Sequence, residues 1–136
     1  MNELREWGLI IGDEPLPTPL RRACHEGRLV GGLSLSLRAL PDEVVSTLTW
    51  AVGVQKFRVL DVRTTSPMVM EIEWGELHET WEVEDVTALI DELNALFDEA
   101  PALKELVVLG EWEDMLQVWA VPKRHADEIA DLSGRQ

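Results

Sequence analysis

The sequence has a single cysteine and no long apolar run. Cys24 has no second cysteine with which to form an internal disulfide, so nothing in the chain indicates an oxidising compartment. The apolar run near the amino terminus, Gly8 to Gly12, is far shorter than the roughly 20 residues that a membrane helix needs. It follows Glu3, Arg5 and Glu6 instead of a positively charged segment, so a secretory signal is not expected. We therefore expect a cytoplasmic protein without a membrane helix.

Basic residues are scarce in the second half of the chain. Residues 1–63 hold eight basic and eight acidic side chains, whereas residues 64–136 hold four basic and eighteen acidic ones. The whole formal charge of −14 therefore lies in the second half. This excess of carboxylates argues against direct binding to nucleic acid and to anionic membranes, because phosphates would be repelled. A neutral half joined to an acidic half creates an oriented field, which suits recognition of a basic protein partner.

Short periodic segments separated by glycine, proline and charged residues predict a single α+β domain over residues 1–136, with the neutral and acidic halves sharing one core. We expect a mainly antiparallel sheet of about five or six strands, with helices packed on one face. The expected order is α-α-β-α-β-β-β-α-β-β-α. Helices are expected near residues 2–11, 19–27, 41–53, 86–97 and 126–132, and strands over 33–37, 57–62, 68–74, 77–83, 106–109 and 115–121; residues 7–11 are also compatible with a strand. Gly75-Glu76 and the segment 110–114 are expected to be hairpin turns.

The carboxylates of the second half fall into three groups, on the first hairpin, on the 86–97 helix and in the second turn. Between Glu71 and Asp114, Lys104 is the one basic residue, so most of these negative charges have no positive neighbour in the sequence. We therefore predict that a basic partner binds to side chains from these three groups: Glu71, Glu73, Glu92, Asp98, Glu99, Glu111, Trp112, Glu113 and Asp114. Asp98 and Glu99 follow a helix carboxyl end, where the helix dipole is already negative and acids are disfavoured. The alternatives are an ordinary solvated face, or pairing with Lys104 or with an arginine of the neutral half, such as Arg38, Arg58 or Arg63.

Trp112 lies between acidic residues at a turn, where a large aromatic ring would be exposed unless it folds back. An exposed tryptophan framed by carboxylates suits a hot spot that docks into a basic surface. The alternative is that Trp112 packs over its hairpin. Trp74, Trp81 and Trp119 lie within strand patterns and are expected in the core.

No residue pattern predicts an enzyme, a cofactor or a metal site. His78-Glu79 begins like a zinc-protease motif, but Glu82 stands where that motif requires histidine. Cys24 and His25 are neighbours on a helix and point about 100° apart, so they do not form a nucleophile and base pair. His125 and Glu128, three residues apart, are too few ligands to hold a metal.

The charge pattern favours an acidic protein-binding module that neutralises a basic partner. Immunity proteins, antitoxins and inhibitors of nucleases or of nucleic-acid-binding effectors act in this way, although no motif carries that analogy here. A structural or oligomer-forming component, such as a phage or assembly protein that forms a homodimer through its neutral half, is the main alternative. A small enzyme would instead require a deep pocket lined by His25, His78 or a pair of carboxylates.

Overall fold

The computed structural model describes residues 2–16, 19–36, 38, 41–65, 67–98 and 104–134. The chain divides into two compact units, Met1–Arg38 with Glu105–Gln136 and Ala39–Lys104. Five helices and six strands occur within the described residues, in the order that the sequence predicts. None of the described helices is long and apolar enough to cross a membrane.

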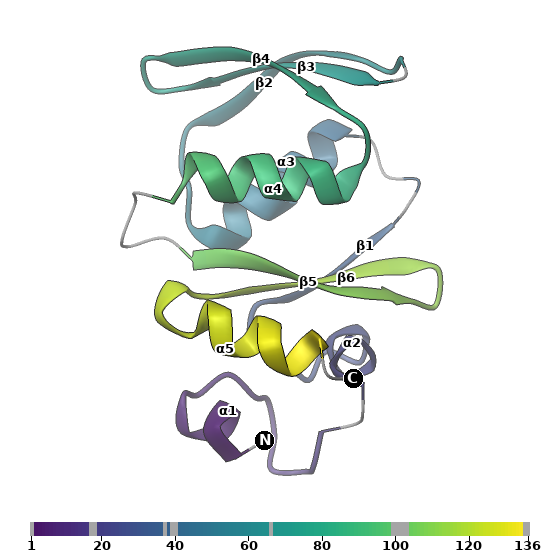
Figure 1. Cartoon of the computed structure of the whole chain (residues 1–136), viewed down its shortest axis with the longest axis vertical. Coiled ribbons are helices and arrows are strands. Elements are labelled where there is room, and N and C mark those ends of the chain that lie inside the picture. Colours follow the sequence, from purple (N-terminus) through teal and green to yellow (C-terminus); the bar gives the residue numbers. More distant parts are fainter. Residues whose placement is uncertain are drawn as a thin grey trace. The chain divides into compact units, whose positions relative to one another are not determined.

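The first unit is built on a three-stranded antiparallel sheet. Strand β6 (Met115–Pro122) lies between β1 (Gly32–Ser36) and β5 (Lys104–Trp112). Helices α2 (Leu20–His25) and α5 (Lys123–Gly134) lie on the same side of this sheet (Figure 1). The cross-strand register between β1 and β6 places Ser34 opposite Gln117.

The core of the first unit surrounds Trp119, whose side chain is completely buried. Ala126 and Ile129 are buried at helical spacing on α5, which explains why this short amphipathic segment forms a helix against the sheet. The Trp119 indole Nε1–H donates to the carbonyl of Val30 over 2.8 Å, so the polar atom of this large ring is satisfied inside the core. The same apolar cluster includes Leu4, from the short helix α1 (Asn2–Glu6).

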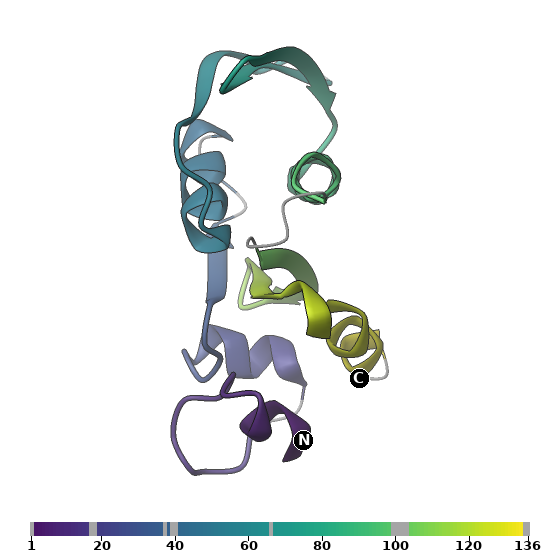
Figure 2. The same ribbon diagram turned by 90° about the vertical axis from the view of Figure 1, so that its left-hand side faces the viewer.

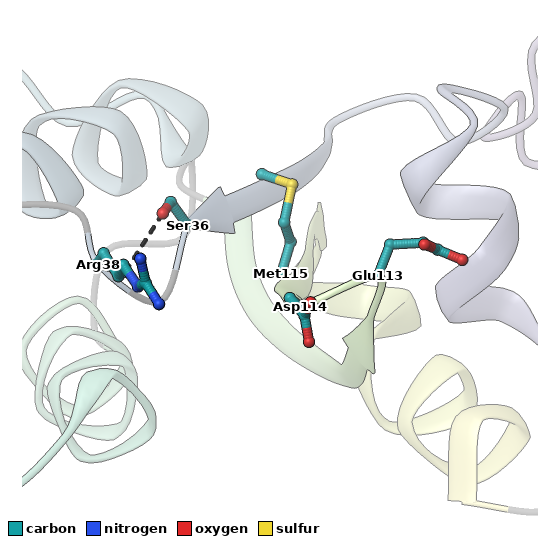
Figure 3. A pocket seen from close by; sticks show the side chains of 5 residues that line it. All are labelled: Ser36, Arg38, Glu113, Asp114 and Met115. Carbon is teal, nitrogen blue, oxygen red and sulfur yellow. Dashed lines mark hydrogen bonds between the residues drawn. The ribbon is translucent and has the colours of Figure 1, made fainter.

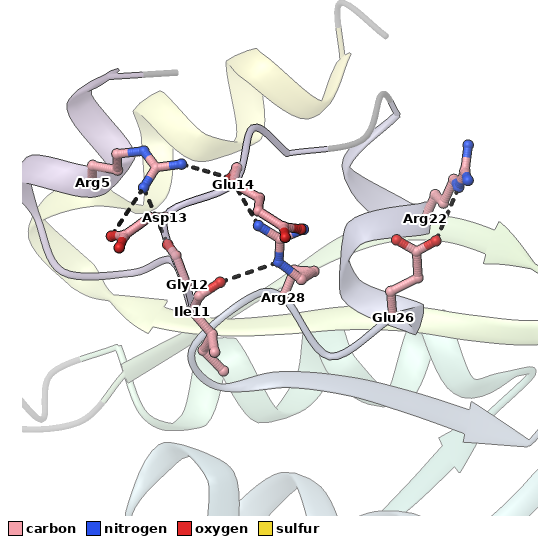
Figure 4. Close-up of polar contacts among 8 residues, drawn as sticks. All are labelled: Arg5, Ile11, Gly12, Asp13, Glu14, Arg22, Glu26 and Arg28. Atoms are coloured by element: carbon pink, nitrogen blue, oxygen red, sulfur yellow. Dashed lines mark hydrogen bonds and ion pairs between the residues drawn. The ribbon is translucent and has the colours of Figure 1, made fainter.

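Two arginines hold the amino-terminal loop in place (Figure 4). Arg5 donates to the carbonyls of Gly12 and Glu14, over 3.1 and 2.6 Å, and Arg28 donates to those of Ile11 and Glu14, over 3.1 and 2.8 Å. Both guanidinium groups therefore converge on the carbonyl oxygen of Glu14. These two guanidinium groups therefore bind backbone carbonyls of their own unit.

The second unit contains a three-stranded antiparallel sheet in the order β2-β3-β4. Strand β2 (Phe57–Arg63) has a register irregularity between Val59 and Asp61, whereas β3 (Met68–Trp74) and β4 (Leu77–Val83) pair without interruption. Helices α3 (Pro41–Val52) and α4 (Val86–Leu96) lie on the same side of this sheet, as the blue and green helices of Figure 2 show. On β3, Glu71 and Glu73 alternate with the buried Met70 and Ile72, so their side chains lie on the other face of the sheet.

Aromatic rings and aliphatic side chains fill the space between these helices and their sheet. Met70 and Ile72 on β3 are completely buried, and Phe97 after α4 meets the rings of Phe57 and Trp74 at centroid distances of 5.8 and 4.8 Å. Asp85 caps the amino-terminal end of helix α4, and its Oδ1 accepts the backbone N–H of Ala88 over 2.8 Å. Such a cap stabilises a helix by about 1 kcal/mol.

The structure confirms the α+β fold class, the antiparallel pairing and the order of elements. It corrects the expectation of one sheet, because the six strands form two sheets of three. Sequence periodicity identifies strands but does not show which distant strands pair, and β1 pairs with β6, far away in the chain. The second turn is also shorter than expected, since β5 continues to Trp112 and leaves only Glu113 and Asp114 in the turn. The single domain remains a prediction.

Candidate functional site

The tip of the β5–β6 hairpin is a two-residue turn in a backbone conformation that its residues do not favour. Glu113 and Asp114 have φ angles of +53° and +61°, which lie in the left-handed region. Positive φ at both central positions defines a type I′ turn, for which pairs such as Asn-Gly are strongly preferred. The left-handed conformation costs most L-residues about 1 kcal/mol or more each, although aspartate tolerates it better than glutamate.

The β3–β4 hairpin provides a direct comparison within the same chain. Its two-residue turn has Gly75 at the first position with φ +61°, while Glu76 has no positive φ. Glycine at the first central position is what a type II′ turn requires. The chain therefore follows the turn preferences in one hairpin and departs from them in the other. Among the described residues, Lys56 is the one other non-glycine residue with positive φ, and it stands alone.

A buried glutamine secures both ends of the strained turn. Gln117 on β6 is completely buried, and its Nε2 donates to the carbonyls of Trp112 and Met115, each over 3.3 Å. Its Oε1 accepts the Ser34 hydroxyl over 2.5 Å, and its Nε2 lies 3.4 Å from Nδ1 of His25. Because a buried amide without partners would be costly, these contacts bind the turn firmly to the sheet. Sequence reasoning missed Gln117, whose signal was a polar side chain in an otherwise apolar strand.

Trp112 is partly exposed and already has a cation beside it. The Arg21 guanidinium lies 5.7 Å from the centroid of the Trp112 ring, within the range of a cation–π contact. Arg21 also passes Gly110, whose φ of +121° is a conformation that side-chain-bearing residues rarely adopt. The ring therefore packs against its own unit on one side, and part of its surface is left for other contacts.

The acidic side chains at the hairpin tip have no ion-pair partners within the described part of the chain. Glu111, Glu113 and Asp114 are all exposed. Glu113 and Asp114 line an open hollow of about 550 Å³ together with Ser36, Arg38 and Met115 (Figure 3). The hollow is thus lined by two carboxylates, one guanidinium, one hydroxyl and the side chain of one methionine.

The carboxylates predicted on the first hairpin have partners. Glu71 Oε1 lies 2.6 Å from Nε2 of His78, and Glu73 lies 3.7 Å from Arg58. Both pairs are partly exposed, so each contributes at most about 1 kcal/mol to stability. The alternative of pairing with a neutral-half arginine therefore applies to Glu73. These two residues share the polar face of β3 but are not a free acidic surface.

The remaining predicted residues lie around α4. Glu92 is exposed on that helix and has no ion-pair partner among the described residues. Asp98 is exposed just after the helix, and it is not free of contacts, because it interacts with another group of the protein. Glu99 lies outside the described residues. The acidic residues of α4 and of the β5–β6 tip belong to different units. That they form one continuous acidic surface therefore stays a prediction.

Arginines of the neutral half are mostly used within that half. Four of the five arginine ion pairs between described residues join an arginine to an acid from residues 1–63: Arg5–Asp13, Arg22–Glu26, Arg28–Glu14 and Arg63–Asp61. Within the described ranges, Arg58 is the one arginine that forms an ion pair with an acid of the second half, which is Glu73. The second half therefore keeps most of its negative charge. The unit Ala39–Lys104, which spans the boundary between the two halves, holds fourteen acidic residues against four basic ones.

Sequence reasoning also missed an exposed tryptophan. Trp50 on α3 is 79% exposed, whereas Val44, Val45 and Leu48 on the same helix are buried. Its exposure could have been predicted from the sequence, because Trp50 lies outside the apolar stripe that α3 buries. It lies in Ala39–Lys104, away in sequence from the hairpin-tip residues, and no described contact links it to them.

Two features of the described residues bear on catalytic chemistry, namely the grouping of metal-binding side chains and the state of the Cys24 thiol. No cluster of three or more histidine, cysteine or acidic side chains that could hold a metal occurs among the described residues. Cys24 is buried, and its thiol donates to the carbonyls of Leu33 and Val118 over 3.4 and 3.7 Å. Desolvation by burial raises the pKa of the Cys24 thiol from 9.0 to about 11. A nucleophilic cysteine requires the opposite shift.

The raised pKa of Cys24 predicts a loss of stability at high pH. In the unfolded chain the thiol ionises near pH 9, while in the folded protein it keeps its proton until about pH 11. Thiolate formation therefore favours unfolding between these two values, and the free energy of unfolding should fall as the pH rises through that window. Denaturant unfolding from pH 8 to 11 should show this slope in the wild type and a smaller slope in Cys24→Ala. Equal slopes would contradict the assignment.

Comparison with protein-family models, with curated proteins and with solved structures found no match.

Proposed function

We propose that the protein is an acidic binding module that neutralises a basic protein partner, and that the tip of the β5–β6 hairpin is its main contact. The observation that carries the proposal is the pair Glu113 and Asp114, whose carboxylates have no ion-pair partner among the described residues and extend from a turn whose conformation they disfavour. Residues in sparsely populated backbone regions concentrate at functional sites, because selection for stability alone would replace them.

The arrangement of the tip suits a cationic surface. Glu111, Glu113 and Asp114 supply three exposed negative charges, and the partly exposed ring of Trp112 supplies apolar contact area beside them. A cation from the partner could pair with these carboxylates, since no cation within the described residues does so. Because Gln117 binds the backbone on both sides of the turn, the backbone that presents the carboxylates is held in place before binding and less backbone entropy is lost.

The overall charge supports fast association with a basic target. Most arginine ion pairs between described residues join arginines of the neutral half to acids of that same half, so the formal charge of −14 leaves a strong negative field around the protein. Complementary fields raise association rates by about ten to a thousandfold, and salt screens the effect. An inhibitor, immunity protein or antitoxin that covers the basic surface of a nuclease or other nucleic-acid-binding effector needs these properties.

The proposal predicts that neutralising the tip removes binding without affecting folding. The variant Glu113→Gln with Asp114→Asn keeps the side-chain shapes and removes two charges. The matched control, Asp127→Asn with Glu128→Gln, removes two exposed charges from α5 in the same unit. Wild type and control, immobilised at low salt, should retain a basic protein from a lysate of the native host. The tip variant should bind that protein at least about tenfold more weakly.

Two outcomes would contradict the proposal. One is equal retention of the captured protein by the tip variant and the control. The other is a binding partner that is neutral and insensitive to salt. Sedimentation of the purified protein measures its oligomeric state and so distinguishes a binding module from the main alternative, a structural component. A homo-oligomer whose size does not change with salt would favour the structural component.

A further inference from the structure

The free edge of strand β4 is the longest regular sheet edge of the second unit. Strand β4 pairs with β3 on one side over seven consecutive residue pairs, from Met68↔Val83 to Trp74↔Leu77. It is the outer strand of the sheet, and no hydrogen bond between described residues reaches its other side. The opposite edge, β2, is interrupted by a register irregularity, which commonly prevents strand pairing.

The turn that starts β4 determines which backbone groups are free. A two-residue turn joins Trp74 to Leu77, so these two residues exchange hydrogen bonds as a closely paired couple. The pattern alternates along an antiparallel pair. The N–H and C=O groups of His78, Thr80 and Glu82 therefore point to the free side. All three residues are exposed, so an added strand would meet little obstruction from their own unit.

Several side chains along this edge are negative, and no cation among the described residues pairs with them. Glu76, Glu79, Glu82 and Glu84 are exposed in or beside β4, and none has an ion-pair partner among the described residues. Glu79 and Glu82 lie on opposite faces of the strand, because side chains alternate along it. A second copy of the chain added at this edge would bring like charges together, which disfavours self-association. A strand that carries lysine or arginine would instead place opposite charges across the new pair.

We propose that β4 accepts an extended, lysine- or arginine-bearing segment of the partner as an additional antiparallel or parallel strand. Backbone hydrogen bonds to His78, Thr80 and Glu82 would hold the segment, and Glu79 and Glu82 would select its positive side chains. The inference rests on the proposed function in taking the partner to be cationic. It adds the form of the recognised element, which is an extended strand.

A synthetic peptide and one edge variant test this mode of binding. The probe is a peptide of about seven residues in which lysine alternates with threonine, long enough for a typical strand. The variant Thr80→Pro removes the central free N–H while leaving the pairing with β3 intact, because proline is tolerated at strand edges. Thr80→Val, which keeps the N–H, is the matched control. Thr80→Pro should weaken peptide binding about tenfold or more, and Thr80→Val should leave it nearly unchanged.

A second measurement keeps the test valid if Thr80→Pro fails to fold. The same peptide, methylated on alternate backbone nitrogens, keeps every charge but cannot form a complete ladder. Binding of the two peptides to the wild-type protein should differ by about tenfold or more. Backbone amide shifts on binding should centre on β4.

The outcomes separate the inference from the proposed function. Equal binding of the methylated and unmethylated peptides, or of Thr80→Pro and Thr80→Val, would show that charge alone holds the peptide and would overturn strand addition. Absence of peptide binding at low salt would overturn it as well. Neither result bears on the tip variant and its α5 control, whose retention of a basic protein tests the function itself.

Discussion

Replacement of Gln117 by leucine is expected to destabilise the first unit by about 3 kcal/mol and to release the hairpin tip. The substitution preserves volume approximately but removes the amide that binds the carbonyls of Trp112 and Met115 and the hydroxyl of Ser34. Each buried polar group left without a partner costs about 1 to 3 kcal/mol. Denaturant unfolding followed by tryptophan fluorescence measures the change in free energy.

Thr49→Val is the matched control for this prediction. Thr49 is also buried, but its hydroxyl donates to the carbonyls of Val45 and Ser46 within its own helix. Its removal leaves no distant group unsatisfied and should cost less than about 1 kcal/mol. If Gln117→Leu is no more destabilising than Thr49→Val, the buried amide does not secure the turn. Loss of the turn should also lower affinity for the partner, because the carboxylates would no longer be held in position.

Exchange of the strained turn for a favoured one is expected to stabilise the protein. Glu113→Asn with Asp114→Gly places the preferred type I′ pair at positions where φ is already +53° and +61°. Relief of the left-handed strain should raise the free energy of unfolding by about 1 to 2 kcal/mol, less the small entropic cost of glycine in the unfolded chain. Removal of two neighbouring negative charges acts in the same direction.

The corresponding control uses the other hairpin. Gly75→Asn changes a turn that already follows its preference, since Gly75 has φ +61° at the position where type II′ turns require glycine. This variant should be less stable than the wild type. Opposite signs for the two hairpins would show that the effect depends on turn geometry, and a shared sign would exclude that explanation.

The sequence predicted local elements well because their signals are short-range. Gly75-Glu76 was identified as a turn from the alternation on both sides of it, and α4 from its apolar stripe. The order of helices and strands follows from such patterns alone. In each case the interacting residues are only a few positions apart, so the sequence itself contains the periodicity.

Long-range pairing was not predictable in the same way. The division into two sheets depends on β6 lying between β1 and β5, which no single-strand pattern encodes. The same limit applies to the site. The cation beside Trp112 comes from Arg21, distant in the chain, and the partner of Glu73 is Arg58 on a neighbouring strand. The number of charges in each half does not show that Arg58 lies beside Glu73, so the sequence left that pairing as one of several alternatives.

The left-handed turn at Glu113 and Asp114 could not be predicted from the sequence for a different reason. Residues 110–114 contain a glycine, which made a longer turn around Gly110 the natural expectation. In the structure Gly110 instead lies within β5, and the turn falls on two residues that do not favour it. Departures of this kind from local preference are expected where function, and not stability, selects the residues.

The most direct test of this account is the affinity of the Glu113→Asn, Asp114→Gly protein for the basic partner retained by the wild type. If the two carboxylates are maintained for binding at the expense of stability, this variant should be more stable than the wild type and bind at least about tenfold more weakly at low salt. A variant that is more stable and binds as tightly as the wild type would contradict the account.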